Sequence, residues 1–282
     1  MSGVRAFGRV SLPSGRPARS APVRLILRYP GIAGLLAALV IWWLIALSGT
    51  VQADVLPSPV DVASAIVTYL YTPYGPTTLV GHALVTSYRV VGGFALGLVA
   101  GVALGVLMRF VPQFHPVLDP IFSFLRPVPA FAFVTLLMLI LGIGEAEKIA
   151  LLFLAVFPAM TVYTNAAFNA LPPELEDAAR SLGARRLRFF WNVQVPAALP
   201  DIFVGARIML AVSWTAMMGA ELVAAESGLG WMIWNALKNS QTVIVFAGVV
   251  CISAIAAAMD YAVAYLGERV TGGWRQRLRG GE

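Results

Sequence analysis

The sequence predicts an all-α, polytopic membrane protein with six transmembrane helices. Hydrophobic residues make up 59% of the 282 residues and charged residues only 12%, and the mean hydropathy is +0.80. Such a chain has too little polar surface to cover an ordinary soluble domain. Its apolar runs approach the roughly 20 residues that cross a bilayer, and its basic residues gather in alternate segments between these runs.

The N-terminal segment 1–28 carries six arginines and no acidic residue, and it is rich in Ser, Pro and Gly. We expect a disordered, basic cytoplasmic tail there, a six-helix domain over 29–268 and a cytoplasmic C-terminal tail over 269–282. The first span covers 31–49. A secretory signal peptide is the alternative for this run, but the run is long and further spans follow it.

Five more apolar runs follow, and a helix over 60–71 is expected to lie on the outer membrane surface, after Pro57 and Pro59. The predicted spans are 90–108, 130–143, 149–171, 202–223 and 243–266, and a basic loop is expected over 109–126. In the second span, glycines recur every four residues, which predicts close approach of another helix. These glycines are Gly93, Gly97, Gly101 and Gly105.

The distribution of basic residues predicts the orientation. Sixteen of the twenty Lys and Arg residues fall in the two tails and in the loops on the same side, whereas only Lys148 and Lys238 lie on the other side. Both termini and the long polar loop at 172–201 are therefore expected in the cytoplasm. Because membrane topology accounts for the net charge of +6, the charge does not indicate a nucleic-acid partner.

The polar loop at 172–201 has the pattern of a structured element. Pro172 and Pro173 can begin a short helix, and Gly183 can end it. A basic and aromatic unit over 185–191 follows, and it is expected to end at Pro196. The alternative is a solvated loop that merely carries a run of charges.

The sequence carries no motif for catalysis. A Gly-rich phosphate-binding loop and a nucleophile elbow are both missing, and His82 and His115 have no second ligand at metal spacing. We therefore expect no enzyme activity, metal or cofactor in this chain, and energy must come from a partner.

Charged groups inside apolar spans are costly unless they are paired or face water. Arg207 and Asp260 are expected to form a structural pair, whereas Glu221 is interpreted either as a gate or docking residue or as plainly solvated. The fifth span also suits a pathway wall, although simple packing is an equal alternative. The pathway candidates are Phe131, Ser213, Trp214, Met217, Met218 and Glu221.

The spacing of Asp177, Ala178, Ala179 and Gly183, followed by Val193–Pro196, resembles the EAA signature of ATP-binding-cassette (ABC) importer permeases, with Asp in place of Glu. Other stretches resemble the sulfonate/nitrate/taurine branch of that family, and within it the taurine permeases. They include Leu56–Pro59, Arg126–Pro129, Leu141–Gly144, Gly205–Ile208, Ala220–Leu222 and Gly228–Gly230.

This resemblance implies a type I importer permease in a bacterial inner membrane. It implies a second permease copy, two cytoplasmic ATPase subunits that carry ATP and Mg, an external binding protein, and contact with lipid. The residues that it assigns to ATPase coupling are Glu174, Asp177, Ala178, Ala179, Arg180, Gly183 and Pro196.

The implied substrate is taurine, an alkanesulfonate or a similar small anion, with nitrate, bicarbonate or another small organic compound as alternatives. An ion-coupled secondary transporter is the alternative from another class. It would carry carboxylates near mid-membrane, or broken half-helices with internal repeats.

Overall fold

The computed structural model describes residues 30–52, 54–111, 113–125, 128–181, 183 and 185–279. The chain divides into two compact units, Met1–Ala53 and Asp54–Glu282. Helix α2 (Pro30–Leu47) belongs to the first unit and coincides with the first predicted span. The predicted tail over 1–28 lies outside the described residues.

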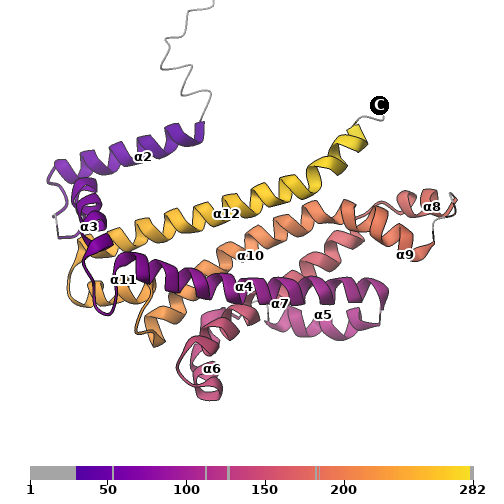
Figure 1. Cartoon of the computed structure of the whole chain (residues 1–282), viewed down its shortest axis with the longest axis horizontal. Helices are drawn as coiled ribbons and strands as arrows, with labels where there is room; N and C mark the ends of the chain where they lie inside the picture. The colour runs from indigo at the N-terminus through magenta and orange to yellow at the C-terminus, as the bar shows by residue number, and fades with distance from the viewer. Residues whose placement is uncertain are drawn as a thin grey trace, which may run out of the picture. The chain divides into compact units, whose positions relative to one another are not determined.

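The second unit is built from helices, and no strand occurs among the described residues, so the all-α prediction is confirmed (Figure 1). Its elements are α3 (Pro59–Tyr71), α4 (Leu79–Phe110), α5 (Phe114–Leu125), the 3₁₀ turn η1 (Ala130–Phe133), α6 (Val134–Leu141), α7 (Glu145–Asn169), α8 (Pro173–Ser181), α9 (Arg186–Phe189), the π-helical turn η2 (Phe190–Gln194), α10 (Val195–Ala224), α11 (Leu229–Lys238) and α12 (Thr242–Arg279).

Within the described ranges, four helical segments are long and apolar enough to cross a membrane. They are α4, α7, the segment Leu187–Ala224 that contains α10, and α12 up to Gly272. Helix α5 together with Ala130–Leu141 forms a pair bent by 90° that can count as a fifth, and α2 adds a shorter apolar helix over Ala33–Leu47. The count of six spans therefore stays a prediction.

Two segments differ from the sequence-based expectation. The basic loop expected over 109–126 is wrong, because α5 fills most of it, with Phe114, Leu118, Ile121 and Leu125 at helical spacing. The third span also is not one continuous helix, since a 3₁₀ turn that follows Pro129 precedes α6.

The glycines of α4 pack directly on α7, which confirms the predicted close approach. A Cβ atom added at Gly93 would lie 2.3 Å from Leu152 Cβ, and one at Gly105 would lie 2.5 Å from Thr164 Cβ. Gly97 and Gly101 make the same kind of approach to Val156 and Met160. Because the residue numbers rise together on both helices, α4 and α7 run parallel, with their backbones in close contact.

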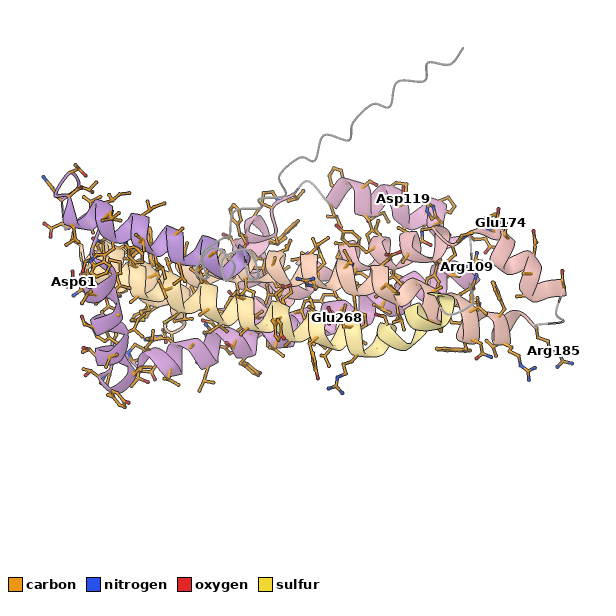
Figure 2. The ribbon with its side chains drawn as sticks, turned by 90° about the horizontal axis from the view of Figure 1, so that it is seen from above. Asp61, Arg109, Asp119, Glu174, Arg185 and Glu268 are labelled. Atoms are coloured by element: carbon orange, nitrogen blue, oxygen red, sulfur yellow. The ribbon has the colours of Figure 1, made fainter. Side chains whose placement is uncertain are left out.

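The second unit has two distinct ends. Figure 1 shows α8 and α9 at one end and α3 and α11 at the other, and in Figure 2 Glu174 and Arg185 lie at the end opposite Asp61. Helix α11, which the sequence reading did not predict, packs against α12, α10 and α4. The loop predicted to couple to an ATPase is therefore separated from the α3–α11 end by the length of the bundle.

The close packing of the α4 glycines on α7 predicts that the same Gly→Ala substitution changes the stability of the protein differently at two positions of α4. Gly101→Ala should destabilise the protein by about 1–3 kcal/mol, because its Cβ would lie 2.6 Å from Met160 Cβ and 2.8 Å from the Phe157 carbonyl oxygen. Gly92→Ala is the control, since its nearest neighbour would be 3.8 Å away. This control should be neutral or stabilising by up to about 1 kcal/mol, because Ala favours the helix. Thermal unfolding in detergent measures both, and equal melting temperatures would contradict the contact.

Candidate functional site

Helix α8 forms the centre of the polar loop and confirms the short helix expected there. It begins at Pro173, and Gly183 follows it with a φ of +76°, the left-handed conformation that glycine adopts most readily. Glu174, Asp177 and Ala178 are exposed, while Ala179 is partly buried. The backbone of Arg180 lies in α8, and its side chain is outside the described residues. The chain thus presents acidic and small apolar side chains on a short exposed helix.

The next segment attaches this loop to the bundle. Phe190 is 1% exposed, and its ring lies 4.6 Å from that of Phe110 on α4 and 5.5 Å from that of Phe168 on α7. Leu187 and Trp191 instead point outward, with about 60% of each residue exposed. One side of the α9–η2 segment is therefore buried in the core, and the other side exposes large apolar side chains.

Pro196 does not end the basic and aromatic unit, and that expectation is wrong. Helix α9, the π-helical turn and α10 follow one another without a gap, and Pro196 lies in the first turn of α10. The π-helical turn ends at Gln194, directly before α10, and a turn of this kind interrupts the regular hydrogen-bond ladder, so a proline is tolerated near this junction. The polar loop and the fifth predicted span consequently form one continuous helical segment.

The residues expected along a pathway do not surround a common cavity. Trp214 and Met217 are buried in the core, and the Ser213 hydroxyl donates to the Met209 carbonyl of its own helix at 2.8 Å. Met218 is half-buried, while Phe131 is 58% exposed and lies against Gly219 of α10. A pathway role for these residues stays a prediction.

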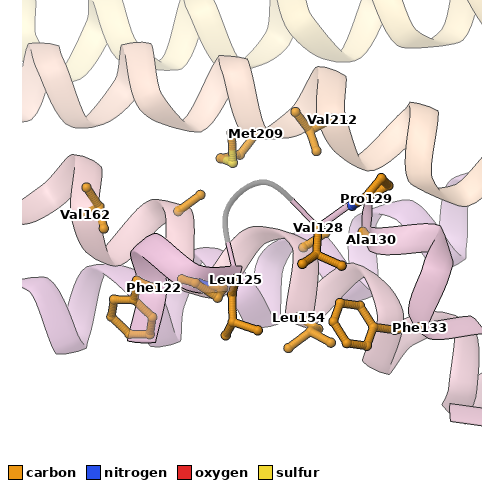
Figure 3. Close-up of a pocket in the computed structure, with 13 residues that line it drawn as sticks. Phe122, Leu125, Val128, Pro129, Ala130, Phe133, Leu154, Val162, Met209 and Val212 are labelled. Carbon is orange, nitrogen blue, oxygen red and sulfur yellow. The ribbon is translucent and has the colours of Figure 1, made fainter. Parts of the chain in front are cut away.

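A separate cavity of about 300 Å³ lies between α5, η1, α7 and α10 (Figure 3). Its lining residues all have apolar side chains, and they include Phe122, Pro129, Phe133, Pro158 and Met209. None of the six pathway candidates lines it. The prolines explain part of its shape, because Pro158 lies within α7 and Pro129 precedes the 3₁₀ turn.

The opposite end of the bundle contains a buried charge cluster centred on Arg89 of α4. Its Nη1 donates to Glu221 Oε1 at 2.8 Å and to the Ser227 carbonyl at 2.7 Å. Its Nε and Nη2 donate to the two carboxylate oxygens of Glu145 at 2.7 and 2.5 Å. One guanidinium therefore joins α4 to the start of α7, the end of α10 and the turn before α11.

The Glu221 carboxylate is fully enclosed by hydrogen-bond donors. Thr86 Oγ1 donates to it at 2.9 Å, and the Gly230 N–H donates to its Oε2 at 2.8 Å. Gly228 has a φ of +123°, and an added Cβ there would lie 2.3 Å from Glu221 Oε1, so only glycine leaves room for the carboxylate. The solvated interpretation of Glu221 is wrong, because the residue is 1% exposed.

His82 completes this end of the bundle. Its Nδ1 accepts the Gly228 N–H at 3.0 Å, its Nε2 lies 2.9 Å from the Tyr74 carbonyl, and its ring stacks on Trp231. Since the Nδ1 accepts, we assign the proton to Nε2. Both ring nitrogens are thus used to hold the turn before α11 and the turn before α4.

The expected pair of Arg207 and Asp260 is confirmed. Arg207 Nε and Nη2 donate to the two Asp260 oxygens at 2.8 and 2.6 Å, which joins α10 to α12. Sequence reasoning missed the Arg89 cluster because the second predicted span began at residue 90, which left Arg89 just outside it. Residue 89 lies instead ten residues into α4, and an arginine so far inside an apolar helix is itself the signal that a buried partner exists.

Comparison with known proteins agrees with this architecture. Residues 93–272 match the family model described as binding-protein-dependent transport system inner membrane component. The chain is 34% identical over 242 residues to the taurine transport system permease protein TauC of Escherichia coli, covering 85% of this chain and 88% of that protein. It is 35% identical over 288 residues to a putative aliphatic sulfonates transport permease protein SsuC of Bacillus subtilis, covering 99% and 100%.

A solved structure titled as inward-facing conformations of the MetNI methionine ABC transporter matches the fold with a TM-score of 0.55 and 21% identity, over 69% of this chain and 95% of that one. The family match, the two relatives and the helical architecture agree with one another. The chain belongs to the family of binding-protein-dependent transport system inner membrane components.

Proposed function

We propose that this chain is the membrane-spanning permease of an ATP-driven importer and that α8 is the helix that couples it to a cytoplasmic ATPase. In this proposal two permease chains work with two ATPase subunits and an external binding protein. The distribution of basic residues supports a cytoplasmic position for α8 and for both termini.

The observation that carries the coupling role is the contrast between the two sides of the α8–α9 loop. Its outer side exposes Glu174, Asp177, Leu187 and Trp191, whereas Phe190 is buried between rings of α4 and α7. A solvated linker needs no such anchor. A force applied to α8 by a docked ATPase would pass through this anchor to both helices and directly into α10.

An ion-coupled secondary transporter fits less well. The bent pair α5 and α6 is a feature that such transporters share. However, the two carboxylates within the predicted spans 202–223 and 243–266, Glu221 and Asp260, are each paired with an arginine in the described structure. A carboxylate that already has a cationic partner is poorly suited to bind and release a coupling ion.

The transported compound is proposed to be taurine or another small alkanesulfonate. The support is that the relatives named above are described as permeases for taurine and for aliphatic sulfonates, which share the sulfonate group.

The coupling role predicts that Gly183→Val abolishes uptake, while Gly183→Asn retains most of it. Valine at a φ of +76° costs at least about 1 kcal/mol locally and redirects the chain into α9, whereas Asn tolerates this conformation. Among the described residues, no atom lies within 4 Å of a Cβ added at Gly183, so the difference isolates backbone geometry from packing. Uptake and ATP hydrolysis in reconstituted vesicles measure it.

Asp177→Lys is the companion substitution, because it reverses the charge of an exposed side chain on α8. Uptake and substrate-stimulated ATP hydrolysis should both be lost, while membrane insertion and substrate capture by the binding protein persist. If Gly183→Val and Asp177→Lys both show normal stimulated hydrolysis and uptake, α8 is not the coupling element.

The orientation predicts the labelling of two single cysteines in a Cys251→Ser background. Arg185→Cys, next to α8, should be protected from an impermeant thiol reagent added to intact cells. Ser64→Cys, on the exposed surface of α3 at the other end, should react. The reverse pattern would place α8 outside and refute the topology.

The substrate proposal predicts that cells expressing the complete transporter take up labelled taurine. Unlabelled methanesulfonate should compete for this uptake, whereas nitrate and bicarbonate should not. A binding protein of this system that captures only a sugar, a peptide or a cation would refute the assignment.

A further inference from the structure

The two arms of the Arg89 cluster differ in their exposure to solvent. The Arg89 side chain is 3% exposed and that of Glu221 is 0% exposed, whereas the side chain of Glu145 is 50% exposed. The guanidinium therefore holds one carboxylate in the protein interior and another at its surface.

Because of this difference in exposure, breaking the Arg89–Glu221 bond costs more free energy than breaking the Arg89–Glu145 bond. Separating a fully buried pair leaves an uncompensated charge, which is strongly unfavourable. Glu221 also holds the Thr86 hydroxyl and the Gly230 N–H, so its loss would leave several polar groups without partners. Glu145 can instead be hydrated when it leaves Arg89, and the buried guanidinium then keeps the Glu221 carboxylate as its counter-charge.

Arg89 would keep partners after Glu145 leaves, because its Nη1 still donates to Glu221 and to the Ser227 carbonyl. The start of α7 likewise has its own internal bonds. Lys148 Nζ donates to the Gly144 carbonyl at 2.9 Å and to Glu147 Oε2 at 3.1 Å. Arg89 and the start of α7 are thus each held by other hydrogen bonds, so the Arg89–Glu145 contact can break without unfolding either one.

The connections of the two arms show what such a separation would move. Glu221 and Ser227 belong to α10 and to the turn that follows it, whereas Glu145 is the first residue of α7, directly after the glycine turn that ends α6. C-terminal to Glu145, α7 is held against α4 by the glycine contacts described above, which begin with Gly93 of α4 against Leu152 of α7. Only the α6–α7 turn and the first residues of α7 can move away without disturbing those contacts.

We propose that Arg89 is a positioning residue with a permanent bond to Glu221 and a releasable bond to Glu145, and that release of the α6–α7 turn accompanies opening of this end of the bundle during transport. This proposal rests on the proposed importer function. In this proposal, Glu145 controls the position of the α6–α7 turn, and Glu221 keeps Arg89 attached to α10 throughout.

The test compares Glu145→Gln with Glu226→Gln in the complete, reconstituted transporter. Both substitutions keep the side-chain size and remove one negative charge, but Glu226 is an exposed residue of the α10–α11 turn and is not one of the Arg89 partners described above. Hydrogen–deuterium exchange reports on the segments 142–147 and 226–232, and ATP hydrolysis is measured without the binding protein.

Glu145→Gln should speed exchange at 142–147, leave 226–232 unchanged, and raise hydrolysis without the binding protein by at least about fivefold. Glu226→Gln should change none of these quantities. Unchanged exchange at 142–147 would overturn the proposal. Faster exchange with unchanged hydrolysis would also overturn it, because the bond would then be merely structural.

ATP hydrolysis by the unsubstituted complex distinguishes a failure of this proposal from a failure of the proposed importer function. If its hydrolysis does not respond to the binding protein and substrate, the importer function fails, whatever the exchange at 142–147 shows. If it responds normally and Glu145→Gln behaves like Glu226→Gln, only the releasable bond is refuted.

Discussion

A charge enclosed by apolar helices must find its partners within the protein, and the architecture at one end of the bundle follows from this constraint. Arg89 lies within α4, and its guanidinium donates hydrogen bonds to Glu145, to Glu221 and to the Ser227 carbonyl. Because Glu221 in turn accepts the Gly230 N–H, the start of α11 is fixed over the end of α10. A second bidentate pair, between Arg207 and Asp260, is partly exposed and joins α10 to α12.

The middle and the other end of the bundle depend on shape rather than charge. Between parallel α4 and α7, each glycine is matched by a side chain of the facing helix, which leaves little freedom for these helices to slide. At the far end, Phe190 lies against rings from both helices and thereby attaches the exposed α8 to this rigid pair. The exposed helix α8 and the close-packed pair of α4 and α7 are thus connected through the buried Phe190 ring.

Much of this could be predicted from local patterns. Hydropathy located α2, α4, α7, α10 and α12, since a bilayer requires long apolar helices, and the proline and glycine positions located α8. Helix α5 was missed because two arginines and several prolines in the surrounding segment favoured a loop over its apolar periodicity. Helix α11 was missed because ten residues are too few to span a membrane and its stability comes from packing on α12, α10 and α4.

Local patterns along the chain were enough to predict the helical class, the family resemblance and the close approach of another helix along α4. The packing of the helices was needed to show that α7 is the partner of the α4 glycines, that Asp260 pairs with Arg207, and that Arg89, Glu145 and Glu221 meet. These residues are separated by up to 132 positions, and a contact at that separation depends on how whole helices pack. A local pattern can show that a buried charge needs a partner, but only the packing of the helices decides which residue provides it.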